Sequence, residues 1–183
     1  MSAKPPDESS LFEAALNHLA RYAATEAGLA RVLARKIDRW ARQQSTDTDP
    51  ETISAFARRA KSSIPAIITR LKSAGALNDE AYAASRAKRL TREGKSRRGA
   101  LAHLAAKGIA PATAASILTD DPDRELAAAC AYLRRRRAGP FGNTPELKIL
   151  GAMARAGFTQ STARQALRLD RQEAEARIKT LSD

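Results

Sequence analysis

Hydrophobic residues recur every three or four positions along most of the chain, with polar residues between them. Leu29, Leu33 and Ile37 form one such series, and Ile67 and Leu71 belong to another. This spacing brings the apolar side chains onto one face of an α-helix. The pattern therefore predicts a succession of helices that bury one face each.

Polar residues that cap helices mark where the first of these helices should begin. Ser10 and Glu13 form an S-x-x-E capping box, so we expect order to start at Ser10, after a disordered lead-in at residues 1–9. Thr25 is a candidate cap for the next helix, and Asp49, followed by a proline, is a candidate for another.

Similar signals divide the rest of the chain. Asn78 and Ser96 are expected to cap helices that end at Gly94 and Gly108, and Asp121, followed by a proline, opens a later one. Further boundaries are expected at Gly75, where a helix should end, at Pro111 and Pro145, where helices should begin, and in a loop at 138–143.

An internal repeat links two of these segments. Residues 104–118 align without gaps on residues 153–167, and Gly108 then falls on Gly157. Each copy contains a helix, a glycine that can adopt positive φ, an apolar residue and a second helix. A unit this small cannot bury its apolar face alone, so neighbouring units should stack.

The composition supports helices and argues against a sheet. Ala, Leu and Arg are abundant and favour helix, whereas the chain has one valine and 4% aromatic residues. A sheet is built mainly from β-branched and aromatic residues. The sequence therefore predicts an all-α fold.

The net charge of the chain indicates which kind of partner it would bind. The chain has 32 Lys and Arg against 20 Asp and Glu, a formal net charge of +12. Such a surplus favours a polyanion, because neutralised phosphates release condensed counterions; a solvated basic surface is the alternative. The low aromatic content argues against binding single strands by base stacking.

The basic residues near predicted helix ends are the candidates for this binding. They could contact DNA phosphates or acidic groups of a protein partner, or they could be solvated charge. Four consecutive arginines at 134–137 cannot share one helix face, so only one or two of them should make contact. The candidates are Arg86, Lys88, Arg89, Arg92, Lys95, Arg97, Arg98, Arg134, Arg135, Arg136 and Arg137.

No pattern for catalysis, a cofactor or a metal is evident in the sequence. His18 and His103 are isolated, and Cys130 lies among alanines, where a thiol is usually a small buried hydrophobe. Asp120 and Asp121 precede a helix and are interpreted as capping residues. We expect a protein that is not an enzyme. Because neither a signal peptide nor a membrane-spanning run is evident, we expect it in the cytoplasm, without membrane contact.

Three stretches resemble the RecX family, regulators of the RecA recombinase. The first, at 72–83, contains a glycine, a leucine, an acidic pair and an aromatic residue followed by Ala. The second, at 94–109, is similar to the family's Gly-Lys run and ends in Lys-Gly-Ile. The third, at 155–167, resembles the closing motif of the family's last repeat. Their order and spacing are more specific than any one motif.

The resemblance implies three tandem three-helix repeats in an elongated, curved arrangement. It also implies a monomer that binds the RecA–DNA filament and inhibits its ATPase, strand-exchange and coprotease activities during recombinational repair. The chain departs from the family in the first repeat, where an extra segment is inserted. The expected divisions are a lead-in at 1–9, repeat 1 at 10–77 with an insertion at about 38–62, repeat 2 at 78–120, repeat 3 at 121–170 and a polar helical tail at 171–183.

Two other classes of protein fit some of these features. Residues 97–118 have the length of a helix-turn-helix and would suit a transcription factor. The second helix of this segment, at 111–118, has no Arg, Lys, Asn or Gln to contact base edges, which argues against that function. A structural nucleoid or ribosome-associated protein would explain the charge but not the repeat.

Overall fold

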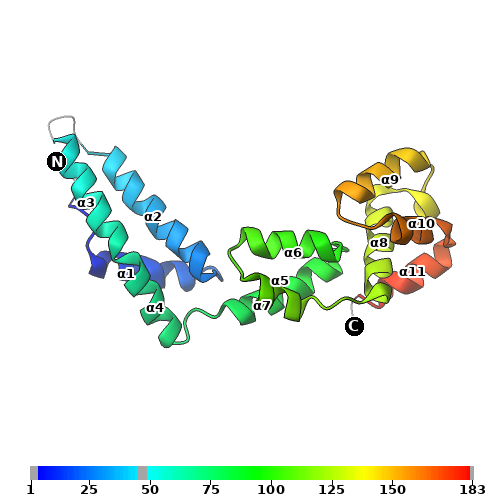
Figure 1. Cartoon of the computed structure of the whole chain (residues 1–183), viewed down its shortest axis with the longest axis horizontal. Helices are drawn as coiled ribbons and strands as arrows, with labels where there is room; N and C mark the ends of the chain where they lie inside the picture. Colours follow the sequence, from blue (N-terminus) through cyan, green and yellow to red (C-terminus); the bar gives the residue numbers. More distant parts are fainter. Residues whose placement is uncertain (1–3, 45–48, 182–183) are drawn as a thin grey trace. The chain divides into compact units, whose positions relative to one another are not determined.

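The computed structural model describes residues 4–44 and 49–181, and these residues form helices joined by turns and loops (Figure 1). The all-α prediction is confirmed for this part of the chain. The chain divides into two compact units, with the division between Tyr82 and Ala83, inside one helix. None of the described helices combines the length and the apolar surface needed to cross a bilayer.

The described residues of the first unit form four helices and the start of a fifth, and side-chain caps fix where several of them begin. Thr25 Oγ1 accepts a hydrogen bond from the Gly28 amide at 2.9 Å, and an Asp49 carboxylate oxygen accepts one from the Thr52 amide at 2.8 Å, as predicted for both caps. The helices are α1 (Glu8–Leu19), α2 (Glu26–Arg42), α3 (Pro50–Ser62) and α4 (Ile64–Ser73), followed by α5 (Asp79–Arg92).

The predicted start of the first helix is wrong. Helix α1 begins at Glu8, inside the expected lead-in, because an Asp7 carboxylate oxygen accepts a hydrogen bond from the Ser10 amide at 2.9 Å. Ser10 lies within the helix, and its hydroxyl donates back to the Asp7 carbonyl at 3.0 Å. The carboxylate of Asp7 therefore takes the capping role that the pattern assigned to Ser10. Residues 1–3 of the expected lead-in lie outside the described part.

The core of the first unit lies among α1, α2, α3 and α4. Residues 38–62, expected as an insertion, contain the end of α2 and all of α3. Residues 45–48, between these two helices, lie outside the described residues. Trp40 and Phe56 join these two helices edge to face, with ring centroids 6.5 Å apart, and Lys61 pairs with Asp38 at 2.6 Å. The fully buried side chains of this core include Leu11, Leu29, Leu33, Ile37, Ile67 and Leu71.

The second unit contains most of α5 and the remaining helices. Gly108 and Gly157, the paired glycines of the repeat, have φ values of +90° and +93°, which confirms the expected positive φ at both. The elements that follow α5 are α6 (Arg97–Ala106), α7 (Pro111–Ile117), α8 (Pro122–Arg136), the short 3-10 helix η1 (Gly139–Phe141), α9 (Glu146–Arg155), α10 (Gln160–Arg168) and α11 (Arg171–Lys179).

Helix α8 is the centre of this unit. Every residue from Leu126 to Leu133 is buried, as expected of a helix that is apolar on all sides and covered by its neighbours. Helices α10 and α11 pack against α8 (Figure 1). The segment expected as a polar tail contributes Ala174, Ile178 and Leu181 to this core, so α11 is part of the packed unit.

Candidate nucleic-acid interface

The junction between α5 and α6 is held tightly against α8. Gly94 ends α5 with φ of +64°, and a Cβ at this position would lie 2.5 Å from Ala131 Cβ and 3.0 Å from the Ala128 carbonyl oxygen. No other residue type fits both the positive φ and the close approach. The backbone just before Lys95 and Ser96 is therefore fixed.

Ser96 connects this junction to the turn between α9 and α10. Its hydroxyl, only 1% exposed, donates to the Ala156 carbonyl at 2.5 Å and accepts from the Gly99 amide at 3.0 Å. The predicted cap at Ser96 is confirmed, and its second bond was not foreseen. Gly157 allows the contact, because a Cβ there would lie 2.8 Å from the Ser96 hydroxyl oxygen.

These contacts enclose a pocket of about 450 Å³ between the junction, α6, α8 and the end of α9. Three cationic side chains line it, and no carboxylate does. We call it the basic pocket; the residues that give it its character are Lys95, Arg135, Arg155, His103, Tyr132 and Phe158.

The aromatic residues form a fixed wall of the basic pocket. Tyr132 and Phe158 meet edge to face with ring centroids 5.6 Å apart, and the Tyr132 hydroxyl donates to the Ala152 carbonyl at 3.2 Å. Both residues are buried, which leaves little ring surface on which a base could stack. Tyr132 instead supports a cation, because the Arg135 guanidinium carbon lies 5.9 Å from its ring centroid.

Positive charge is concentrated around the pocket. Arg86 Nε donates to His103 Nε2 at 3.0 Å, so the imidazole is neutral and accepts at that nitrogen. Burial lowers the pKa of His103, and the positive charges of Arg86, Lys107 and Lys95 lower it further. The cations repel an additional proton here, and the same field would attract an anion.

The cations of the pocket differ in how they are held. Burial lowers the pKa of Arg135, while the nearby Glu93 carboxylate opposes that shift. Lys95 and Arg155 have no hydrogen bond or ion pair with another side chain in the described part of the chain. Glu93 itself is engaged by Arg89 at 2.8 Å, outside the pocket. Lys95 and Arg155 are therefore available to an external anion.

Two of the predicted contact residues beside Ser96 have different roles. Arg97 Nε donates to the Leu118 carbonyl at 2.7 Å, and its amide donates to a Glu125 carboxylate oxygen at 2.8 Å. Arg97 thus joins α6 to the end of α7 and the start of α8. Arg98 is exposed and makes no hydrogen bond or ion pair within residues 4–44 and 49–181.

The four arginines at the end of α8 are all exposed. Arg135 lines the basic pocket, and the Arg136 guanidinium carbon lies 5.4 Å from the Tyr132 ring centroid. Arg137 ends α8 in a left-handed conformation with φ of +49°. Arg134 lies on the exposed face of the helix.

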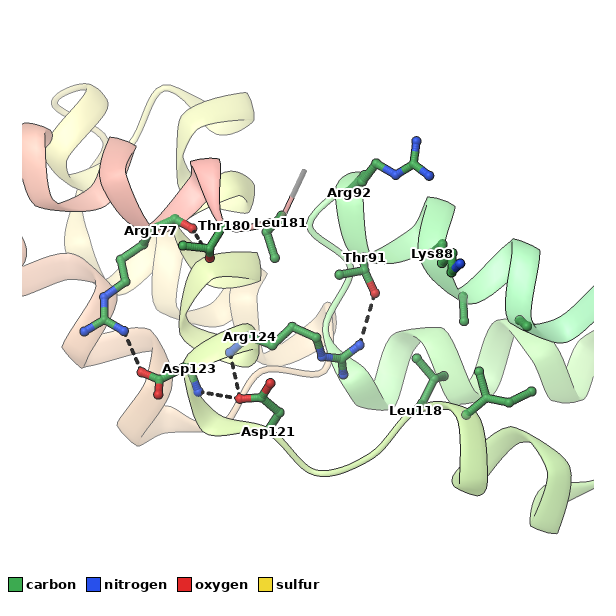
Figure 2. Close-up of a pocket in the computed structure, with 13 residues that line it drawn as sticks. Lys88, Thr91, Arg92, Leu118, Asp121, Asp123, Arg124, Arg177, Thr180 and Leu181 are labelled. Atoms are coloured by element: carbon green, nitrogen blue, oxygen red, sulfur yellow. Dashed lines mark hydrogen bonds and ion pairs between the residues drawn. The ribbon is translucent and has the colours of Figure 1, made fainter. Parts of the chain in front are cut away.

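The remaining candidates, Lys88 and Arg92, line a second depression of about 820 Å³ between α5, α7, α8 and α11 (Figure 2). We call it the α5–α8 groove. It contains two further cations that sequence reasoning missed, Arg124 and Arg177. Arg155 of the basic pocket was also missed, although it belongs to one of the three motifs of the family resemblance.

Metal binding or reactivity would depend on the other titratable groups within residues 4–44 and 49–181. No cluster of three His, Cys, Asp or Glu side chains that could hold a metal occurs in the described residues. Burial raises the pKa of the Cys130 thiol to about 11, so it stays protonated at neutral pH. Asp121 caps α8 by accepting hydrogen bonds from the amides of Asp123 and Arg124, as predicted.

Comparisons with known proteins place the chain in a family. No family model and no solved structure matches the chain. The regulatory protein RecX of Myxococcus xanthus is 34% identical over 166 residues, which cover 86% of this chain and 83% of that protein. The regulatory protein RecX of Agrobacterium fabrum is 31% identical over 166 residues, covering 88% and 83%. Identity at this level over most of both chains shows that the protein belongs to the RecX family of regulatory proteins.

Proposed function

We propose that this protein binds the RecA–DNA filament in the cytoplasm and lowers the filament's ATPase, strand-exchange and coprotease activities. The observation that carries the proposal is membership of the RecX family over most of the chain. The protein acts by binding, and no catalytic step of its own is needed.

The basic pocket supports a DNA contact within this function. It presents Lys95, Arg135 and Arg155 around a single hollow without a neutralising carboxylate. Phosphates bound there would release counterions, which favours binding to any sequence. Because the rings of Tyr132 and Phe158 are buried, base stacking contributes little to this contact. The DNA contact we propose is therefore to the phosphate backbone.

The geometry favours this function over a helix-turn-helix transcription factor. Helix α7, which would have to enter the major groove, spans only Pro111–Ile117 and has no Arg, Lys, Asn or Gln for bidentate or long-reach contacts with base edges. Arg97, at the start of α6, uses its guanidinium on the Leu118 carbonyl. The segment is built for packing within its own unit.

The proposal is tested by titrating the protein into RecA filaments formed on single-stranded DNA while ATP hydrolysis is followed. We expect hydrolysis to fall at equimolar or lower protein-to-RecA ratios. Electron microscopy of the same samples before addition establishes that the filaments are intact. Unchanged hydrolysis over a wide concentration range, with intact filaments, would refute the proposed function.

A further inference from the structure

The α5–α8 groove differs in chemistry from the basic pocket. Its floor is apolar and is formed by side chains from four helices or their ends. Leu118 and Leu181 are almost fully buried beneath it, and Ile117 and Ala84 are half-buried along its walls. A volume of about 820 Å³ lies in the range of about 300–1,000 Å³ typical of sites that enclose a ligand.

Two of the cations of the groove are already engaged. Figure 2 shows Arg124 reaching from α8 to α5, where its Nη1 donates to Thr91 Oγ1 at 3.0 Å. Arg177 pairs with Asp123 at 2.6 Å. The first contact joins α8 to α5 and the second joins α11 to α8, and together they neutralise or engage both of these arginines.

The other two cations remain available. Lys88 and Arg92 are exposed on α5, four residues apart and therefore on one helix face, and neither has a hydrogen bond or ion pair within the described residues. The carboxylates of the groove, Asp121 and Asp123, are engaged in the α8 cap and with Arg177. One wall of an apolar hollow thus presents two unneutralised positive charges.

We propose that the α5–α8 groove binds a short acidic peptide segment of a protein partner, one that carries a single bulky apolar side chain. That side chain lies against Leu118 and Leu181, and the flanking carboxylates contact Lys88 and Arg92. Acidic motifs are commonly recognised by paired basic side chains beside a pocket for one anchor residue.

The groove suits a peptide better than a nucleic acid. Among the described residues, no aromatic side chain lines the groove, so a base would find no ring there on which to stack. An aliphatic floor favours an apolar side chain instead. This inference is independent of the proposed contact between the basic pocket and DNA.

The test is direct binding of a labelled synthetic peptide of Asp and Glu with one central Phe, measured by fluorescence anisotropy with the full chain and without RecA or DNA. We expect saturable binding, and we expect the Lys88→Glu and Arg92→Glu double variant to weaken it by about tenfold or more. The matched control is the Arg164→Glu and Arg168→Glu double variant, which makes the same charge change on exposed positions of α10, outside the groove.

Two further measurements make the result decisive. Replacing the central Phe of the peptide by Ser should also weaken binding, because it removes the group that meets the apolar floor. A peptide with benzophenone at that position should crosslink to the segments around Leu118 and Leu181. The proposal is overturned by absence of binding, by equal losses in both double variants, or by indifference to the Phe. Crosslinks confined to other surfaces would overturn it as well.

Discussion

Two helix ends of the protein have the same backbone geometry in different surroundings. Helix α4 ends at Gly75 with φ of +72°, and α5 ends at Gly94 with φ of +64°. In each, the amide after the glycine donates to a carbonyl five residues earlier, at 2.9 Å and 3.0 Å. A Cβ at Gly75 would meet nothing within 4 Å, whereas one at Gly94 would collide with α8.

The difference shows which junction is packed against a neighbouring helix. At Gly75 the glycine serves only the turn, and the chain continues to the buried Leu77 of the first unit. At Gly94 the glycine also brings the junction onto Ala131, and Lys95 and Ser96 follow directly. A close backbone approach therefore fixes the basic pocket, while the same local motif elsewhere only reverses the chain. The predictions below test this contrast.

The largest expected effect is on stability at the two glycines. Gly94→Ala should lower the free energy of unfolding by about 2–4 kcal/mol, because left-handed strain of about 1 kcal/mol adds to overpacking against α8. Gly75→Ala should cost about 1 kcal/mol, from the strain alone. Thermal and urea unfolding followed by circular dichroism measure both. Equal losses would mean that the contact with α8 contributes nothing.

The second prediction concerns the pocket that the Gly94 junction positions. Replacing Lys95, Arg135 and Arg155 by Ala should weaken binding to single-stranded DNA on the order of tenfold or more. The slope of log K against log salt should flatten by up to about 2.1 units, because each of three lost contacts with single-strand phosphates accounts for about 0.7 units. Fluorescence anisotropy with a labelled oligonucleotide across a salt titration measures both.

The matched control for the pocket variant removes three exposed cations elsewhere in the same unit, Arg164, Arg168 and Lys179. It changes the net charge by the same amount, so a general loss of attraction would affect both variants alike. An unchanged salt slope in the pocket variant, or an equal change in the control, would show that the pocket cations are solvated charge.

Helix starts were the most predictable part of the fold. Thr25, Ser96 and Asp121 cap helices as predicted, because a cap bonds to an amide only two or three residues ahead and its signal is local. The prediction of a cap at Ser10 was wrong for the same local reason. Asp7, three residues earlier, is an equally good capping residue, and the helix begins directly after it. The three-repeat division of the chain stays a prediction.

The pocket was only partly predictable, because it depends on contacts between distant segments. Lys95 and Arg135 were among the candidates on charge alone, but nothing local places Arg155 beside them. That placement follows from the bond between the Ser96 hydroxyl and the Ala156 carbonyl. The structural role of Arg97 was missed for a similar reason, since its acceptor is a carbonyl on another helix.

The third prediction separates Arg97 from Arg98, adjacent residues that charge alone does not distinguish. Arg97→Ala should lower the free energy of unfolding by about 1 kcal/mol, because it leaves the Leu118 carbonyl without its donor. Arg98→Ala should stay within about 0.5 kcal/mol of the parent, as is usual for exposed positions. Urea unfolding measures the difference, and equal stability of the two variants would contradict the role given to Arg97.

The smallest expected effect is a change in the titration of His103, which reports directly on the basic pocket. In the free protein its pKa is lowered from the usual histidine value, because burial and the charges of Arg86, Lys107 and Lys95 disfavour the imidazolium, while Glu93 opposes them. The neutral form contributes stability above the unfolded pKa, and this contribution is lost as pH falls through the lower folded pKa.

A phosphate bound in the pocket should raise the pKa of His103, since a nearby negative charge favours the protonated ring. Proton NMR of the imidazole across pH, with and without an oligo-thymidine strand, measures this shift. His18 is the internal reference: it lies in the first unit with its ring tilted against Tyr22, ring centroids 5.3 Å apart, and its resonance should not respond to the strand. If DNA binds and the His103 titration does not move, the phosphates lie elsewhere, and the tight junction at Gly94 supports the fold but not the DNA contact.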